Sequence, residues 1–192
     1  LAEAIDFRTS FEKVDKNPYL DSFYADSSRW SVHLQVYFLA ERYKEQKRIF
    51  EYGGGFIQDR SIYEDTGIFA NMHYDKWTMS PTDYETYTSL FEAMVMTPYF
   101  PHPDLLIYLE GSLDDIIKRI QIRGREMEQQ TPLDYWKEMH ERYEGWINSF
   151  NACPILRLNI NEYDLNEDPN AIHDILHKVS EHLEQSEKLR KI

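Results

Sequence analysis

The hydrophobic pattern of the chain switches repeatedly between two periods. Short apolar or alternating runs are typical of strands, and longer runs with apolar residues three or four apart are typical of helices. The expected strands are 8–14, 56–58, 104–110 and 155–160. The expected helices are a short one over 17–24, a long one over 28–46, a helical stretch over 59–72, three that begin near 80, 112 and 131, and a last one with apolar Ile172, Ile175, Leu176, Val179 and Leu183.

This alternation of strand and helix predicts an α/β fold, a doubly wound parallel sheet covered by helices on both faces. Leu1 to Ile5 reads as the last turn of a helix that began earlier, so we expect a fifth strand before residue 1. At 192 residues, the chain is expected to form a single domain over 1–192.

Local signals mark where several helices begin and where one ends. Three pairs have the spacing of a capping box, and a proline stands at the expected first helical position of two of these helices. The pairs are Ser80 with Asp83, Ser112 with Asp115, and Thr131 with Asp134, and the prolines are Pro81 and Pro132. Three consecutive glycines, 53–55, precede a strand and lack a Gly-Lys-Ser/Thr ending, so they predict a turn.

Composition narrows the possible partners. The chain has 21 basic and 34 acidic residues, a formal charge of −13, which disfavours nucleic-acid backbones and anionic membranes. Cys153 is the one cysteine, so no internal disulfide can form and a reducing, cytoplasmic location is expected. No apolar run is long enough for a membrane span.

Charged residues follow the expected strands, where ligands bind in open parallel sheets. This rule selects Glu12 after the first strand, Asp59 and Arg60 after the second, and Glu110 with Gly111 after the third. A carboxylate at a strand end suits a phosphate-bound magnesium ion, and an adjacent arginine can pair with a second carboxylate or with a phosphate.

Three arginines, Arg119, Arg123 and Arg125, occupy seven residues around Gly124 at the end of one expected helix. Their forked donors suit the oxygens of a phosphoryl group in transfer. The alternative is a solvated helix face whose cations are favoured by the helix dipole.

Gln35 and Arg42 stand seven residues apart in the long expected helix, about 10 Å along one face. An amide and a guanidinium could together recognise the edge of a nucleobase. An ordinary polar stripe is the alternative.

Taken together, these segments resemble the deoxynucleoside kinases, from Phe11 to Asp164. Within that family, the sequence is most similar to deoxyadenosine kinases of Bacillus type, which also accept deoxycytidine. The segments that carry the resemblance are FEKVDKNPYLDSFYAD, RWSVHLQVYFLAER, QDRSIYEDTGIF, PDLLIYLEG and RIQIRGREMEQQTPLDYWKEMHERYEGW.

The resemblance implies a P-loop kinase-like fold with an arginine-rich lid at about 119–131. It also implies transfer of phosphate from ATP, with Mg²⁺, to the 5'-hydroxyl of deoxyadenosine and of deoxycytidine in nucleotide salvage, by a homodimer built through helices. Family members carry a Gly-Lys-Ser/Thr phosphate loop that this sequence lacks, and we expect that loop just upstream of Leu1.

The resemblance also assigns catalytic roles. Glu12 corresponds to the general base for the 5'-hydroxyl, with Arg60 beside it. Asp59 corresponds to the residue that acts on magnesium. The lid arginines Arg119, Arg123 and Arg125 correspond to those that close over the donor phosphates and act in transfer.

For the base, Gln35 corresponds to the residue that makes paired hydrogen bonds and Phe69 to the aromatic ring that stacks. Arg42 and Asp65 match a charged pair of family members that take purines or deoxycytidine. Thymidine-preferring relatives lack this pair.

For the sugar, Tyr24 and Glu128 correspond to the groups that bind the 3'-hydroxyl. Tyr163 and Asp164 are expected to contact the donor nucleotide.

Two alternative functions stay open: a catalytically silent nucleoside-binding module, and a kinase that prefers another deoxynucleoside such as deoxyguanosine or thymidine.

Overall fold

A computed structural model describes residues 1–11, 17–97, 100–164, 168 and 170–190. The chain falls into two compact units, residues 2–101 and residues 102–192 together with Leu1. We describe each unit by itself, and the single domain over 1–192 stays a prediction.

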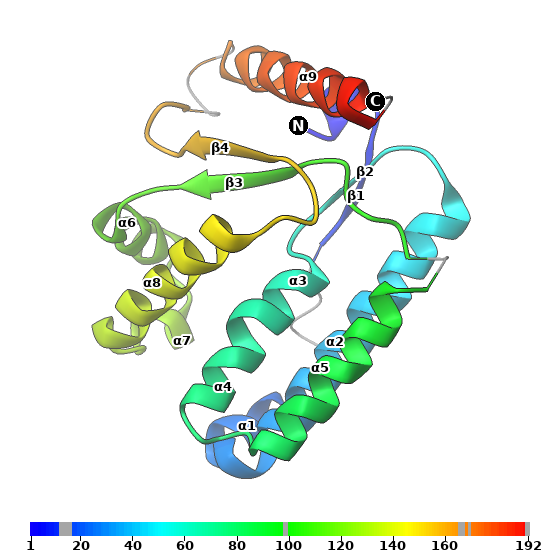
Figure 1. Cartoon of the computed structure of the whole chain (residues 1–192). Helices are drawn as coiled ribbons and strands as arrows, with labels where there is room; N and C mark the ends of the chain where they lie inside the picture. Colours follow the sequence, from blue (N-terminus) through cyan, green and yellow to red (C-terminus); the bar gives the residue numbers. More distant parts are fainter. Residues whose placement is uncertain (12–16, 98–99, 165–167, 169, 191–192) are drawn as a thin grey trace. The chain divides into compact units, whose positions relative to one another are not determined.

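The first unit combines one parallel strand pair with helices (Figure 1). Strands β1 and β2 pair in register from Arg8 opposite Phe56 to Ser10 opposite Gln58. Its elements are η1 (Glu3–Ile5), β1 (Arg8–Ser10), α1 (Leu20–Ala25), α2 (Ser27–Tyr52), β2 (Phe56–Gln58), α3 (Ile62–Glu64), the π-helical segment η3 (Asp65–Ala70), α4 (Asn71–Asp75) and α5 (Pro81–Val95).

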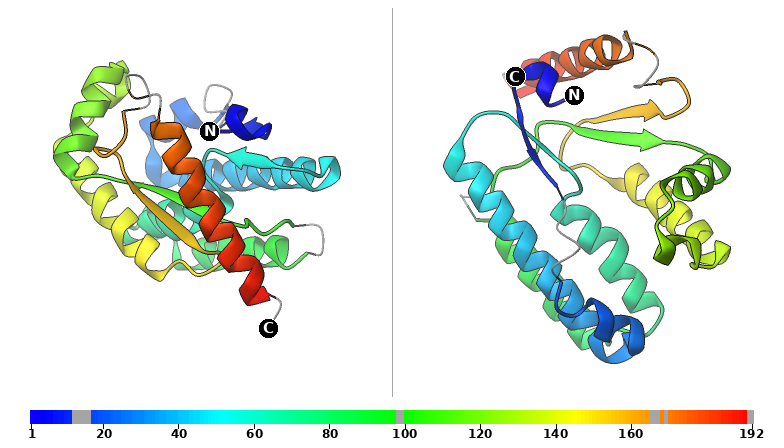
Figure 2. Two further views of the ribbon diagram at one scale, coloured as in Figure 1. Left: turned by 90° about the horizontal axis from the view of Figure 1, so that it is seen from above. Right: turned by 180° about the vertical axis from the view of Figure 1, so that it is seen from behind.

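The second unit places another parallel pair between helices, with α9 on one side and α6 and α8 on the other (Figures 1 and 2). Strands β3 and β4 pair from Leu106 opposite Ile155 to Glu110 opposite Asn159. Its elements are β3 (Leu106–Glu110), α6 (Leu113–Arg123), α7 (Glu126–Gln129), α8 (Leu133–Ser149), β4 (Ile155–Asn159) and α9 (Ala171–Arg190). Both described pairs are parallel, as the alternation predicted.

Side-chain alternation explains how β3 and β4 come to be covered on both faces. Ile107, Leu156 and Leu158 pack in one apolar cluster with Ile175 of α9. Tyr108 and Arg157 point the other way, because successive side chains of a strand alternate. The Tyr108 hydroxyl donates to Glu144 of α8 over 2.8 Å.

Helix α2 is six residues longer at its end than the predicted 28–46. Asp26 caps its start by accepting a hydrogen bond from the amide of Arg29 at 3.1 Å. Nothing between Gln46 and Tyr52 breaks a helix, and Gly53 ends it with φ 65°. The predicted glycine turn is therefore confirmed, and Gly55 leaves room for the ring of Phe7.

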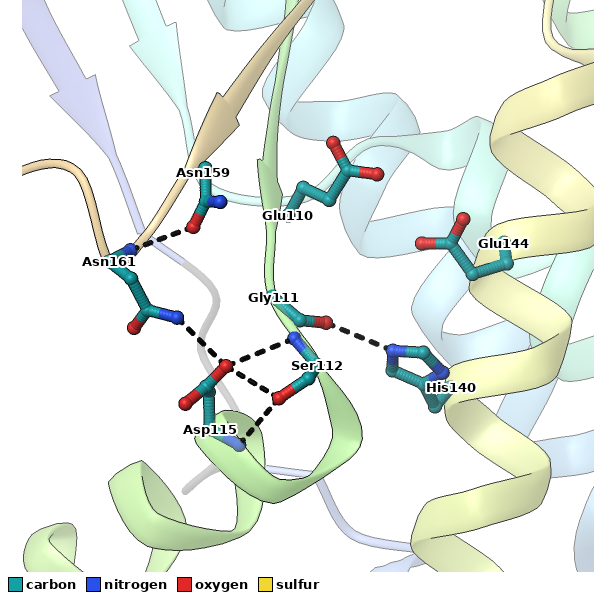
Figure 3. Close-up of a pocket in the computed structure, with 8 residues that line it drawn as sticks. All are labelled: Glu110, Gly111, Ser112, Asp115, His140, Glu144, Asn159 and Asn161. Carbon is teal, nitrogen blue, oxygen red and sulfur yellow. Dashed lines mark hydrogen bonds between the residues drawn. The ribbon is translucent and has the colours of Figure 1, made fainter.

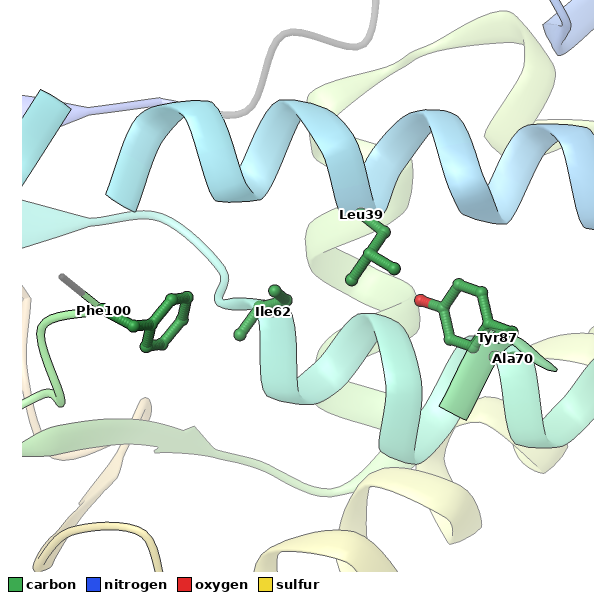
Figure 4. Packing of buried hydrophobic residues seen from close by; sticks show 5 residues of the cluster. All are labelled: Leu39, Ile62, Ala70, Tyr87 and Phe100. Atoms are coloured by element: carbon green, nitrogen blue, oxygen red, sulfur yellow. The ribbon is translucent and has the colours of Figure 1, made fainter. Parts of the chain in front are cut away.

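The apolar core of the first unit joins α2, the α3–η3 segment and α5. Its buried members are Leu39, Ile62, Ala70, Tyr87 and Phe100, shown in Figure 4. Leu39 and Ile62 are fully buried. This core fixes the helices on which the predicted base-binding residues stand.

The capping predictions had mixed outcomes. Ser112 and Asp115 form a complete capping box, and Ser80 accepts from the amide of Asp83. The box at Thr131 and Asp134 is wrong, because Pro132 itself is the N-cap, in an extended conformation with ψ 146°, and makes no side-chain cap bond. The helix therefore begins one residue later, at Leu133.

Two other predicted elements differ from the structure. The predicted strand over 8–14 ends at Ser10, and its last three residues lie outside the described ones. The helical stretch predicted over 59–72 begins at Ile62 and contains a π-helical turn that no sequence signal indicated. Over the described parts of the chain, no helix has the length and apolar character that a membrane crossing needs.

We expect Leu39→Ala to lower the free energy of unfolding by about 2–5 kcal/mol, because it leaves a cavity in the core of the first unit. Urea denaturation followed by circular dichroism measures the change. The control is Val36→Ala on the same helix, where the side chain is 38% exposed and the loss should stay within about 1 kcal/mol. Equal losses at both positions would contradict the core assignment.

Candidate functional site

The turn after β2 holds two of the predicted residues at the carboxyl end of a strand. The amide of Asp59 donates to the carbonyl of Ser10 over 2.8 Å, so the turn begins where the strand pair ends. Arg60 has φ 62°, in the left-handed region that residues other than glycine rarely adopt. Backbone strain of this kind gathers at functional sites. Both side chains are exposed.

A capping box fixes the exit from this turn. Ser61 accepts from the amide of Tyr63 over 3.2 Å, and Glu64 accepts from the amide of Ser61 over 2.8 Å and also from its hydroxyl. Burial raises the pKa of the Glu64 carboxyl, against the hydrogen bonds from Ser61 and the attraction of Arg60. We did not predict this box, although Ser-x-x-Glu is its known signature.

A buried ion pair joins α2 to η3. The Nε atom of Arg42 lies 3.1 Å from a carboxylate oxygen of Asp65, and the two side chains are only 8% and 5% exposed. A second nitrogen of Arg42 donates to the carbonyl of Asp59 over 3.4 Å. The predicted Arg42–Asp65 pair therefore exists and also contacts the turn after β2.

Phe69 lies next to the same turn. Its ring is 5.1 Å from the guanidinium carbon of Arg60, within the range of a cation–π contact. Phe69 and Asp65 both stand in the π-helical segment η3, a form often found at functional sites.

Gln35 lies in the same helix as Arg42 and is 3% exposed. Its carbonyl oxygen Oε1 has no hydrogen-bond partner among the described residues. A buried amide oxygen without a partner costs free energy, and a ligand that donates to it would recover that cost. This is the feature expected of a base-recognition residue.

The structure does not bring the remaining predicted residues of this unit into the group. Tyr24 lies on α1, is 65% exposed and packs edge-on against Phe23 at 5.6 Å. Among the described contacts, none connects it to Gln35 or Arg42. Glu12 lies outside the described residues.

In the second unit, two of the predicted lid arginines contact one carboxylate. Arg123 donates to both oxygens of Glu128, at 3.0 and 2.8 Å, and Arg125 donates to one of them at 3.4 Å. The predicted phosphate ligands and the predicted sugar ligand therefore contact each other here.

The third lid arginine has a different partner. Arg119 donates to the carbonyl of Ile160 over 2.8 Å, which links α6 to the segment after β4. In the same segment, the hydroxyl of Tyr163 accepts a hydrogen bond from Lys178, and the carbonyl of Asp164 accepts from the amide of Asp168 over 2.9 Å.

A hollow of about 460 Å³ lies at the carboxyl ends of β3 and β4 (Figure 3). His140 donates to the carbonyl of Gly111 over 3.0 Å, and Asn161 donates to Asp115 over 2.8 Å. Its lining is Glu110, Gly111, Ser112, Asp115, His140, Glu144, Asn159 and Asn161.

The charge of this hollow disfavours phosphate, because three carboxylates line it. Hydrogen bonds from Ser112, then from Asn161, lower the pKa of Asp115, which keeps it ionised. Burial and the hydrogen bond to Glu144 raise the pKa of Tyr108, so that phenol stays protonated. Glu110, predicted at the end of the third strand, lines the hollow, whereas the residues to which the family resemblance assigns roles do not.

Asp59 was predicted to act on magnesium. Among the described residues, no group of three or more His, Cys, Asp or Glu side chains could hold a metal ion. Magnesium bound with a nucleotide needs only one or two protein carboxylates, since phosphates and water supply the other ligands. An exposed carboxylate at the end of a strand fits that requirement.

The predicted residues therefore form two groups, one in each unit. In the first, Arg42 contacts both Asp59 and Asp65, and Arg60, the neighbour of Asp59 in the chain, contacts Phe69. Gln35 stands on α2 with Arg42. In the second, contacts join Arg123, Arg125 and Glu128. That the two groups act on one substrate stays a prediction.

The chain is similar to known proteins over nearly its whole length. The family model described as deoxynucleoside kinase matches residues 1–184. The deoxyadenosine/deoxycytidine kinase of Bacillus subtilis is 65% identical over 188 residues, 98% of this chain and 87% of that protein. The deoxyadenosine kinase of Lactobacillus acidophilus is 35% identical, over 96% of this chain and 88% of that protein.

The fold is also similar to solved structures. The deoxyadenosine kinase of M. mycoides with its products dCMP and a flexible dCDP has a TM-score of 0.75 at 27% identity, covering 94% of this chain and 89% of that one. The same enzyme with bound dATP has a TM-score of 0.74 at 28% identity, covering 93% and 89%.

We expect Gln35→Leu to leave the free energy of unfolding unchanged or to raise it, because the substitution removes a buried oxygen without a partner. The matched variant is Gln46→Leu on the same helix, whose amide donates to Gln58 over 2.5 Å. Its loss should be about 1–3 kcal/mol, since Gln58 is left unsatisfied. Thermal and urea unfolding compare the two, and a larger loss at Gln35 would contradict the argument.

Proposed function

The chain belongs to the deoxynucleoside kinase family, and we propose that it transfers the γ-phosphoryl group of ATP to the 5'-hydroxyl of deoxyadenosine and of deoxycytidine. The observation that carries this proposal is the buried Gln35, whose amide oxygen has no partner, on the same helix as the buried Arg42–Asp65 pair. The names of the Bacillus subtilis and Lactobacillus acidophilus relatives support the choice of nucleoside.

Hydrogen-bond chemistry explains why one site accepts both nucleosides. Adenine and cytosine each present an exocyclic amine beside a ring nitrogen that accepts. The Gln35 amide can accept from that amine and donate to that nitrogen. Thymine presents a carbonyl acceptor beside a ring N–H donor, and the Gln35 amide could match that order by rotating. Discrimination between thymine and the other two bases therefore depends on the fixed Arg42–Asp65 pair. Phe69 stacks on the base.

On the donor side, Arg119, Arg123 and Arg125 bind the phosphates of ATP. Their present partners are a carbonyl and one carboxylate. Phosphate oxygens offer more charge to the same donors, so ATP can replace these contacts. Glu128, released from the arginines, then binds the 3'-hydroxyl together with Tyr24. Tyr163 and Asp164 contact the donor nucleotide.

In the reaction, Glu12 takes the proton of the 5'-hydroxyl as that oxygen attacks the γ-phosphorus in line. Arg60 orients the attacking end, and the lid arginines offset the charge that moves toward the leaving ADP. Magnesium, when bound with ATP, supplies further charge neutralisation, and Asp59 is the residue that would hold it.

We further propose a homodimer built through α2 and α5 of each copy, in which case their exposed apolar side chains, such as Leu90, would be covered. A polynucleotide partner is disfavoured by the net charge of −13. A cytoplasmic location remains a prediction from the single cysteine.

We expect ATP-dependent formation of the 5'-monophosphate from deoxyadenosine and deoxycytidine, and slower reaction with deoxyguanosine and thymidine. Chromatography of reactions with the four nucleosides in competition measures this preference.

Gln35→Leu should lower kcat/KM for deoxyadenosine by about 10²-fold or more, because it removes both paired hydrogen bonds. Preference for thymidine would contradict the role given to Arg42 and Asp65.

The same assay separates a kinase from a catalytically silent binding module. A chain that binds deoxyadenosine in calorimetry, yet yields no monophosphate with ATP and Mg²⁺, would support the silent module and refute the proposed reaction.

We expect Glu12→Gln to remove most turnover while nucleoside binding changes little, because the amide keeps the shape of the side chain but cannot take a proton. The loss in kcat should be about 10²-fold to 10⁴-fold, the usual contribution of a general base. Calorimetry of deoxyadenosine binding is the control. Near wild-type kcat in this variant would show that Glu12 is not the base.

A further inference from the structure

Glu64 is a half-buried carboxylate to which the proposed reaction gives no role. It lies at the end of α3, next to Asp65 of the ion pair, and four residues after Arg60. Asp65 is hydrogen-bonded to Arg42, whereas Glu64 accepts from Ser61, and the charge of Arg60 has only a smaller effect on its pKa.

The contacts of Glu64 fix the turn that carries Asp59 and Arg60. One of its oxygens accepts hydrogen bonds from both the amide and the hydroxyl of Ser61, the residue directly after Arg60. Before Arg60, the amide and carbonyl of Asp59 are bonded to Ser10 and Arg42. The turn is therefore held on both sides of the residue with the left-handed backbone, Arg60 at φ 62°.

Helix capping alone does not explain a carboxylate at this position. A glutamine forms the same capping box through its amide oxygen and carries no charge. Burial raises the pKa of the Glu64 carboxyl, while the hydrogen bonds from Ser61 and then the charge of the Arg60 guanidinium act in the opposite direction. The ring of Phe69, 5.1 Å from the same guanidinium, limits where that group can lie.

We infer that Glu64 is a positioning residue for phosphoryl transfer, which holds the Asp59–Ser61 turn and the Arg60 guanidinium in their working geometry without contacting substrate. The inference rests on the proposed function, because it assigns Arg60 to the reacting end of the nucleoside. It adds a residue that acts only through Arg60 and the turn.

The test uses Glu64→Gln and Glu64→Ala, with kcat and KM for deoxyadenosine measured beside thermal unfolding. Glu64→Gln keeps the cap and removes the charge, so we expect an unchanged or higher melting temperature, a kcat lowered by about tenfold, and a KM within about threefold. Glu64→Ala removes both features and should lower kcat further.

Asp83→Ala is the matched control. Asp83 accepts from the hydroxyl of Ser80 over 2.6 Å at the start of α5, in a capping pair away from the β2 turn. This variant should lower the melting temperature and leave kcat unchanged. If Glu64→Ala does not fold, the Glu64→Gln variant decides the question.

A double-mutant cycle shows whether Glu64 acts through Arg60. In an Arg60→Ala background, adding Glu64→Gln should cause no further loss of kcat, since the group that it positions is gone. Wild-type kcat in Glu64→Gln, or an undiminished further loss in the Arg60→Ala background, would overturn the inference. A wild-type chain without kinase activity would overturn the proposed function instead, and this inference with it.

Discussion

The arrangement of the residues proposed to bind the nucleoside depends on the ion pair between Arg42 and Asp65, buried between α2 and η3. Two charges taken out of water are tolerated only while each compensates the other, and removing one leaves the other buried without compensation. The pair therefore permits one relative placement of the two helical elements. Through its contact with the Asp59 carbonyl, Arg42 extends this constraint to the end of β2. The side chain of Arg42 therefore connects the residues proposed to bind the base with the turn proposed to act at the 5'-hydroxyl.

The predicted lid arginines, in contrast, carry exposed charges. Arg123 and Arg125 are 50% and 66% exposed while they contact Glu128. Exposed ion pairs of this kind contribute about 1 kcal/mol or less, because water and salt weaken them. Under the proposed function, such contacts would be exchanged for a triphosphate at little cost, whereas the buried pair would stay in place. Burial would thus separate the fixed part of the proposed site from the part proposed to rearrange when a nucleotide binds.

Much of the framework could be predicted from the sequence because it depends on local rules. The strands at 56–58 and 155–159, the glycine turn after α2 and the cap of α6 each follow from a few neighbouring residues. The box at Thr131 failed because Pro132 took the cap position itself. The partial burial of Glu64 and the unpartnered oxygen of Gln35 could not be predicted, because both depend on packing between segments distant in sequence. The contact of Arg42 with the Asp59 carbonyl also depends on tertiary structure.

The π-helical segment Asp65–Ala70 makes the geometry of the site depend on the number of residues in that segment. Its hydrogen-bonded rings enclose one more residue than those of an α-helix, so the segment accommodates an extra residue without changing the helices around it. Deleting Gly67 would remove the extra residue and let the segment wind as an ordinary α-helix between α3 and α4. Phe69 lies inside the segment, so the direction of its ring toward Arg60 depends on the wider winding as well as on the side chain itself. In this part of the molecule, spacing along the backbone therefore carries information that the identities of the side chains do not.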